Sequence, residues 1–219
     1  FFVYKMKLGI ILSIFLLIII PILVTMIIMI VKYQYLFNYT NQSYISTCYL
    51  GGGEGEWGER DIAYKYTDPN SKVLEFGGGA GSVSQVVQHI LNDPTKHVVI
   101  QPDDDGQMFG GLKQLNANKT SCNSSYKIIN HVLQEGDITE VTNILDDNPD
   151  VIIADCEGCL YNEYKKNPDL FANENLMIQV ERDDFDNSYD NLFTELNMEK
   201  LHTGFHQAFN MEVWKKKQT

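Results

Sequence analysis

The sequence has few basic residues for its length. Its 219 residues include 17 Lys and Arg against 29 Asp and Glu, which gives a formal net charge of −12. A protein whose main partner is nucleic acid needs a basic surface that neutralises phosphates. The acidic balance therefore argues against nucleic acid as the main partner.

Charge is absent from one long segment, residues 8–31, which reads LGIILSIFLLIIIPILVTMIIMIV. As a helix it would extend about 36 Å, enough to cross a hydrocarbon core of about 30 Å with some tilt. A cleaved signal peptide would have a shorter apolar core and an A-x-A-like cleavage site. We therefore expect a single transmembrane helix over 8–31, which contacts the lipid bilayer and follows a short basic segment, residues 1–7.

The flanking charges predict how this helix is oriented. Lys5 and Lys7 precede it and Lys32 follows it, and this slight bias favours a cytoplasmic N-terminus with the rest of the chain luminal or extracellular. Four triplets match the acceptor pattern for N-glycosylation, which agrees with a luminal side. They begin at Asn38, Asn41, Asn118 and Asn123.

Cysteine is also scarce, with Cys48, Cys122, Cys156 and Cys159 as the full set. The sequence CEGC at 156–159 has no second C-x-x-C pair that would complete a zinc site. In a lumen, Cys48 and Cys122 would be able to form a disulfide. For CEGC, small and partly buried residues near a strand end are favoured over a redox pair.

From Val73 onward, apolar segments of strand length alternate with segments of helical periodicity, which predicts an α/β fold. The expected strands are 73–76, 97–102, 126–133, 150–155 and 176–184, and the expected helices lie within 82–91, 108–118, 141–147, 161–171 and 189–200. We predict a mostly parallel sheet with an antiparallel hairpin at 201–216. Residues 71–219 then form the domain, and 32–70 form a linker or cover segment whose glycine-rich part, 49–61, is expected to be a loop with Trp57 available for stacking.

A cluster of glycines follows the first expected strand, in KVLEFGGGAGSVSQVV at 72–87. It lacks the G-K-[ST] ending of a phosphate loop and the G-x-G-x-x-G spacing of a dinucleotide fold. The spacing is instead E-x-G-x-G-x-G, from Glu75 through Gly77, Gly79 and Gly81. Glycines at this place allow a ligand to approach the backbone with no Cβ between them.

That spacing resembles the first motif of the class I S-adenosylmethionine-dependent methyltransferases. DVIIADCEGCLYNEY at 150–164, with LMIQVERDD at 176–184, is similar to the D-x-E-G-x-E-type segment and next strand of the FkbM family. HVVIQPDDD and LNANKTSCNSSYKIINHVL resemble that family's second strand and its downstream Asn and third strand. The resemblance covers roughly residues 70–215 and implies a Rossmann-like class I methyltransferase sheet.

The resemblance implies S-adenosylmethionine as the cofactor and O-methylation of a hydroxyl, such as one on a glycan, as the activity. Residues expected to contact the cofactor are Glu75, Gly77, Gly79, Gly81, Gln101 and Asp103. Gln101 stands where the family has an acid that binds the ribose hydroxyls, and Asp103 is placed to compensate for the missing charge.

Asp155 and Glu157 follow the fourth expected strand and would position the acceptor or remove its proton. For Asp155, a helix N-cap is an equal alternative. Other acids near strand ends, Glu181, Asp183 and Asp184, would be able to hold a divalent metal with Asp155, although no spacing specifies one. His202 and His206 are alternative bases.

Two other functions remain open on the sequence. Asp103, Asp104 and Asp105 form a D-x-D after an apolar strand, which is typical of membrane-anchored glycosyltransferases that bind a metal and a nucleotide-sugar. Alternatively, Gln101 marks a degenerate methyltransferase fold that binds a ligand without catalysis.

Overall fold

The computed structural model describes residues 19–27, 29, 48–51, 56–102, 111–134, 136–182, 188–206 and 209–218. Contacts along the chain separate it into two units, Phe1–Ser46 and Thr47–Thr219. Each unit is described by itself.

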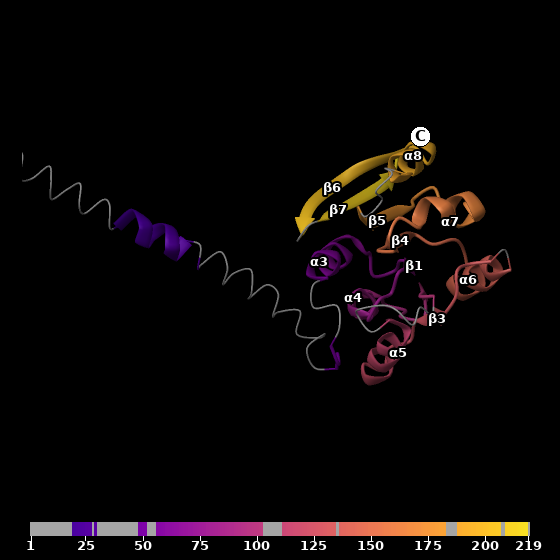
Figure 1. Cartoon of the computed structure of the whole chain (residues 1–219). Helices are drawn as coiled ribbons and strands as arrows, with labels where there is room; N and C mark the ends of the chain where they lie inside the picture. Colours follow the sequence, from indigo (N-terminus) through magenta and orange to yellow (C-terminus); the bar gives the residue numbers. More distant parts are fainter. Residues whose placement is uncertain are drawn as a thin grey trace, which may run out of the picture. The chain divides into compact units, whose positions relative to one another are not determined.

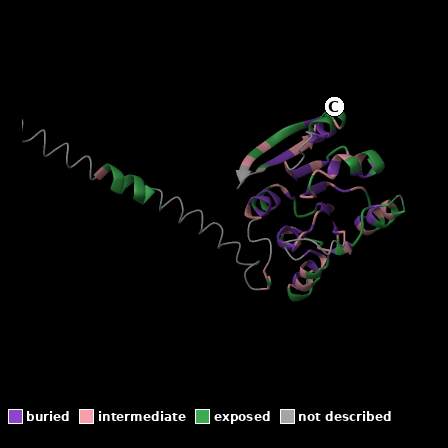
Figure 2. Ribbon diagram, in the orientation of Figure 1, coloured by how far each residue is buried: buried purple, intermediate pink, exposed green. Residues whose placement is uncertain are grey.

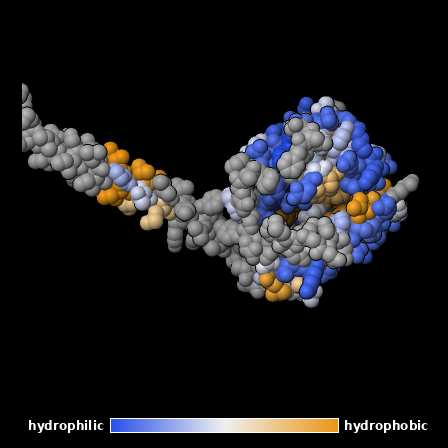
Figure 3. Space-filling model, viewed as in Figure 1, coloured by the Kyte–Doolittle hydropathy of each residue, from blue (hydrophilic) through white to orange (hydrophobic). Residues whose placement is uncertain are grey.

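In the first unit, residues 19–27 are helical. Their apolar side chains are exposed, as at Ile20, Leu23 and Ile27, which are 54%, 51% and 59% exposed, and Figure 3 shows hydrophobic side chains along this helix. Within the described residues, no helix combines the length and the hydropathy that a membrane crossing needs. Most of the predicted span, 8–31, lies outside the described residues.

The second unit contains a seven-stranded sheet in the order β3-β2-β1-β4-β5-β7-β6 (Figure 1). Five strands are parallel, and β7 is antiparallel to both β5 and β6. This arrangement confirms the predicted mostly parallel sheet and its C-terminal hairpin. The strands are β1 Val73–Phe76, β2 His97–Ile100, β3 Lys127–Ile129, β4 Val151–Ala154, β5 Met177–Glu181, β6 Met198–His206 and β7 Phe209–Lys216.

Helices cover both faces of the sheet, which explains why β1, β2 and β4 are buried at every position (Figure 2). One face packs side chains such as Leu74 and Ile152 against α6, α7 and α8, while the other lies against α3, α4 and α5. The helices are α3 Trp57–Tyr66, α4 Ser82–Ile90, α5 Gly111–Ser121, α6 Asp137–Leu145, α7 Leu160–Lys166 and α8 Ser188–Glu195, with a 3-10 turn at Pro168–Phe171.

Helix α3 corrects the prediction of a loop over 49–61. The helix begins at Trp57, and its buried residue Ile62 packs against Met211 and Val213 of β7. Because this contact is with the C-terminal hairpin, tertiary packing stabilises a segment whose local sequence is only weakly helical. The start of α3, which was expected to belong to a connector, therefore forms a wall beside the carboxyl ends of the strands.

Candidate active site

The sheet order changes direction at β1, which has β2 on one side and β4 on the other. In open α/β sheets, ligands bind at the carboxyl ends of the strands beside such a point. Here the ends of β1, β4 and β5 line a pocket through Phe76, Asp155 and Glu181. The wall opposite the strand ends includes Glu56 and Glu59, from the start of α3.

The glycines connect β1 to α4 in a tight turn with three positive φ angles, 83° at Gly77, 48° at Gly79 and 89° at Gly81. A Cβ at Gly77 would lie 1.6 Å from the backbone oxygen of Asp155. The turn therefore touches the end of β4 with no space for a side chain. Gly81 is the N-cap residue of α4, and its amide donates to the oxygen of Gly78 over 2.7 Å.

Gly79 faces the open side of this turn, because among the described residues the nearest atom to an added Cβ would be a carboxylate oxygen of Glu56 at 3.5 Å. Its amide donates to Oε1 of Gln101 over 2.7 Å. Gln101 is 1% exposed and stands directly after β2. The predicted cofactor residues Gly79 and Gln101 are thus brought together, and Glu56, which also accepts a hydrogen bond from Ser82 Oγ, is an unpredicted neighbour.

Glu75 is buried beside the turn and is one of the pocket residues. Its carboxylate accepts hydrogen bonds from Ser84 Oγ at 2.9 and 3.0 Å and pairs with His97 Nε2 at 2.9 Å. Glu75 and His97 are 2% and 0% exposed. This network fixes β1, β2 and α4 to one another, so Glu75 supports the glycine turn, while its direct contact with a cofactor stays a prediction.

Asp155 and Glu157 lie in different surroundings. The amide of Asp155 donates to Phe76 O over 3.0 Å, and its side chain lines the pocket. Glu157 is exposed, has a φ of 55° and is not among the pocket residues. The structure therefore brings Asp155, and not Glu157, to the glycine turn.

The turn after Asp155 is closed by a disulfide between Cys156 and Cys159, whose Cα atoms are 5.4 Å apart. The favoured prediction of small, unbridged cysteines at CEGC was wrong, because the left-handed backbone at Glu157 and Gly158 brings the two cysteines within disulfide range. The predicted Cys48–Cys122 disulfide is confirmed.

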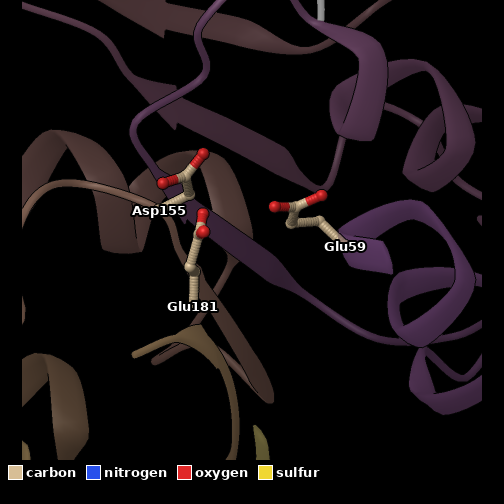
Figure 4. Close-up of side chains that lie close together, drawn as sticks. All are labelled: Glu59, Asp155 and Glu181. Atoms are coloured by element: carbon tan, nitrogen blue, oxygen red, sulfur yellow. The ribbon is translucent and has the colours of Figure 1, made fainter. Parts of the chain in front are cut away.

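A third acid, Glu59 of α3, joins Asp155 and Glu181 in the pocket (Figure 4). Glu59 is 6% exposed. Burial raises the pKa of its carboxyl to about 7, with further increases from the nearby carboxylates of Asp155 and Glu56. Sequence reasoning missed Glu59 because α3 was predicted as a loop.

The raised pKa makes Glu59 destabilising at high pH. The unfolded chain ionises this group near pH 4.5, while the folded chain resists ionisation up to about pH 7. Glu59→Gln is therefore expected to increase the free energy of unfolding by roughly 3 kcal/mol at pH 8 and by less than about 0.5 kcal/mol at pH 4.5. Urea denaturation of both proteins in metal-free buffer measures this. An equal effect at both pH values would contradict it.

Several predicted residues lie outside the described residues, namely Asp103, Asp104, Asp105, Asp183 and Asp184, with the sequons at Asn38 and Asn41. The side chain of His206 is likewise not described. His202, on β6, has its ring 5.5 Å from that of Tyr66 and is not among the pocket residues.

Asn118 is wrongly predicted as a glycosylation acceptor. It is fully buried, and its amide group donates to Ala80 O at 2.8 Å and to Gly51 O at 3.1 Å. It therefore connects the glycine turn to the segment before α3. Asn123, by contrast, is exposed.

Comparison with solved structures identifies the class of fold. An O-methyltransferase from Bacillus cereus in complex with SAH matches with a TM-score of 0.54 and 10% identity, over 84% of this chain and 90% of that chain. The ribosomal protein L11 methylase of Lactobacillus delbrueckii subsp. bulgaricus matches with a TM-score of 0.55 and 11% identity, over 77% and 81%.

A protein of Streptococcus pneumoniae assigned as a tRNA (m1A22) methyltransferase, in complex with S-adenosyl-L-methionine, matches with a TM-score of 0.55 and 9% identity, over 74% and 73%. The chain spans about half the length of a Streptococcus mutans match. The chain thus has the fold of class I S-adenosylmethionine-dependent methyltransferases. No protein-family model and no curated protein matches its sequence, so the FkbM resemblance stays a prediction.

Proposed function

We propose that this chain is an S-adenosylmethionine-dependent O-methyltransferase that acts on a hydroxyl group of a glycan. The observation that carries the proposal is the glycine turn between β1 and α4, which approaches the backbone of Asp155 at Gly77 and lines the same pocket as Asp155. Gly79 offers backbone without a Cβ on the open side of that turn. This cradle fits a cofactor that binds through close backbone approach.

Bound there, S-adenosylmethionine would supply an electrophilic methyl group on a cationic sulfur. The chain must align an acceptor oxygen with that methyl group and accept the proton that the hydroxyl loses. Asp155 is suited to both tasks, since it lines the pocket and its backbone amide donates a hydrogen bond to Phe76 O, next to Gly77.

Thermal stability with ligands tests the proposal. The Tm of the full chain, purified in mild detergent, is measured with and without S-adenosylhomocysteine. In a separate series, Tm with a UDP-sugar plus manganese is compared with Tm in manganese alone. S-adenosylhomocysteine at 100 times its dissociation constant is expected to stabilise by about 2.7 kcal/mol, which raises Tm by several degrees. Stabilisation by the UDP-sugar instead would support the glycosyltransferase, whose Asp103 and Asp105 lie outside the described residues.

Gly79→Val tests whether the turn is the cradle. A valine at a φ of 48° costs roughly 1–2 kcal/mol but leaves the chain folded, and its side chain projects into the proposed cofactor site. We expect the Tm shift with S-adenosylhomocysteine to disappear. Gly136→Val is the matched control, because no atom of the described residues lies within 4 Å of a Cβ there. An unchanged shift in Gly79→Val would show that the cofactor binds elsewhere.

One observation favours a second function, a non-catalytic binding module. Oε1 of Gln101, the expected ribose acceptor, already accepts a hydrogen bond from Gly79. If neither ligand changes Tm, this second function is preferred.

We also propose that the chain is anchored in a membrane by residues 8–31, with the N-terminus cytoplasmic and the domain luminal or extracellular. The exposed apolar side chains of residues 19–27 support an anchor. Two disulfides support an oxidising compartment for the domain.

A further inference from the structure

Three carboxylates converge in the pocket from distant parts of the sequence. Glu59 comes from α3, Asp155 from the end of β4, and Glu181 from the last position of β5. One carboxylate oxygen of each lies within 4.8 Å of the other two. Figure 4 shows the three carboxylates close together, with Glu59 on the opposite side from Asp155 and Glu181.

Two buried oxygens in the same pocket have no hydrogen-bond partner among the residues that the structure describes. They are Oε2 of Glu59, which is 6% exposed, and Oε1 of Gln179, which is fully buried. A buried acceptor without a partner costs about 1–3 kcal/mol, and more when it carries charge. The neighbours that raise the pKa of Glu59, Asp155 and Glu56, are also acidic, so they increase this cost. A bound cation would remove it.

We propose that Glu59, Asp155 and Glu181 bind one divalent metal ion. All three ligands are carboxylates, so the site suits a hard cation such as Mg²⁺, Mn²⁺ or Ca²⁺. Three oxygens that lie within 4.8 Å of one another share a point no more than about 2.8 Å from each, and Ca²⁺ binds oxygen at about 2.3–2.6 Å, so small side-chain movements bring all three carboxylates onto one ion.

The ion would also give the pocket a chemical role, which rests on the proposed function. Three protein ligands leave coordination positions for water or for an acceptor oxygen. A hydroxyl bound to the ion would lose its proton more readily, because the cation stabilises the alkoxide. The proton would pass to the carboxylate oxygen of Asp155 that does not bind the ion, and the methyl group would move from the sulfur to the acceptor oxygen with S-adenosylhomocysteine as the leaving group. Asp155 would then act on the acceptor through the ion, beside the glycine turn that holds the methyl donor.

Ion binding is measured directly, without cofactor. The full chain is stripped with EDTA, dialysed and titrated with MgCl₂, MnCl₂ or CaCl₂ by calorimetry and thermal denaturation. We expect saturable binding of at least one of these ions, one per chain. Glu59→Gln and Glu181→Gln should each weaken it at least tenfold, while Glu199→Gln, an exposed acid on β6, should leave it unchanged.

The variants also show whether a loss of binding is merely a loss of folding. Glu59→Gln is expected to be at least as stable as the parent protein without metal, so its failure to bind would be specific. Absence of saturable binding by all three ions, or equal binding by Glu59→Gln, Glu181→Gln and parent, would overturn the proposal. Ion binding without a Tm shift from S-adenosylhomocysteine would support the metal site and contradict the methyltransferase. A Tm shift from S-adenosylhomocysteine without ion binding would support the methyltransferase and contradict the metal site.

Discussion

Replacing Gly77 with alanine is expected to lower the free energy of unfolding by about 3 kcal/mol or more and to abolish binding of S-adenosylhomocysteine. The added Cβ would lie 1.6 Å from the backbone oxygen of Asp155 and 2.6 Å from its carbonyl carbon. Both obstacles are backbone atoms, so no side-chain rotation relieves the clash. The φ of 83° adds strain for any L-residue.

The clash has to be relieved by separating β1 from β4. The amide of Asp155 donates to Phe76 O over 3.0 Å, so this separation breaks the contact that places Asp155 at the glycine turn. Stability and ligand binding therefore fall together, unlike in Gly79→Val, where binding is lost from a folded chain. Urea denaturation and calorimetry with S-adenosylhomocysteine measure the two effects.

Gly136→Ala provides the control for Gly77→Ala. Gly136 stands at the start of α6 with a φ of −69°, and no atom of the described residues lies within 4 Å of an added Cβ. Alanine there is expected to change the free energy of unfolding by less than about 1 kcal/mol. If Gly77→Ala is as stable as Gly136→Ala, the close approach of β1 and β4 is not a feature of the folded protein.

The strand pattern and glycine spacing predict much of this site because both are local signals. Parallel strands bring their carboxyl ends to one edge, so a turn after β1 and an acid after β4 must lie near each other. That reasoning places Asp155 correctly. Glu157 does not follow it: its backbone is left-handed, with a φ of 55°, and its exposed side chain is not among the pocket residues.

The positions of Glu59 and Gln101 depend on contacts that local sequence patterns do not predict. Ile62, Ala63 and Tyr66 do recur at helical spacing, but the preceding glycines conceal the start of α3, whose packing on β7 is a long-range contact. For Gln101, the resemblance to the FkbM family implies a position beside the ribose of the cofactor. The hydrogen bond from Gly79 to its side chain depends on the conformation of the turn, which the sequence does not specify.

The Cys48–Cys122 disulfide is expected to contribute more stability than the Cys156–Cys159 disulfide. The first joins residues 74 positions apart, the second residues three positions apart. If a disulfide stabilises by restricting the unfolded chain, removal of the first costs about 4 kcal/mol and removal of the second about 2 kcal/mol. The comparison uses the double variants Cys48→Ser/Cys122→Ser and Cys156→Ser/Cys159→Ser.

The two disulfides also differ in what they hold. Cys122 directly follows α5, and Cys48 leads into Leu50 and Gly51, which both hydrogen-bond to Asn118. This connection fixes the segment that enters α3, and therefore Glu59. Removing it should weaken ion binding as well as stability, as measured by urea denaturation and by titration with the ion that the parent binds. If Cys48→Ser/Cys122→Ser loses less stability than Cys156→Ser/Cys159→Ser, the longer loop does not restrict the unfolded chain. If its ion affinity is unchanged, α3 keeps its position without the disulfide.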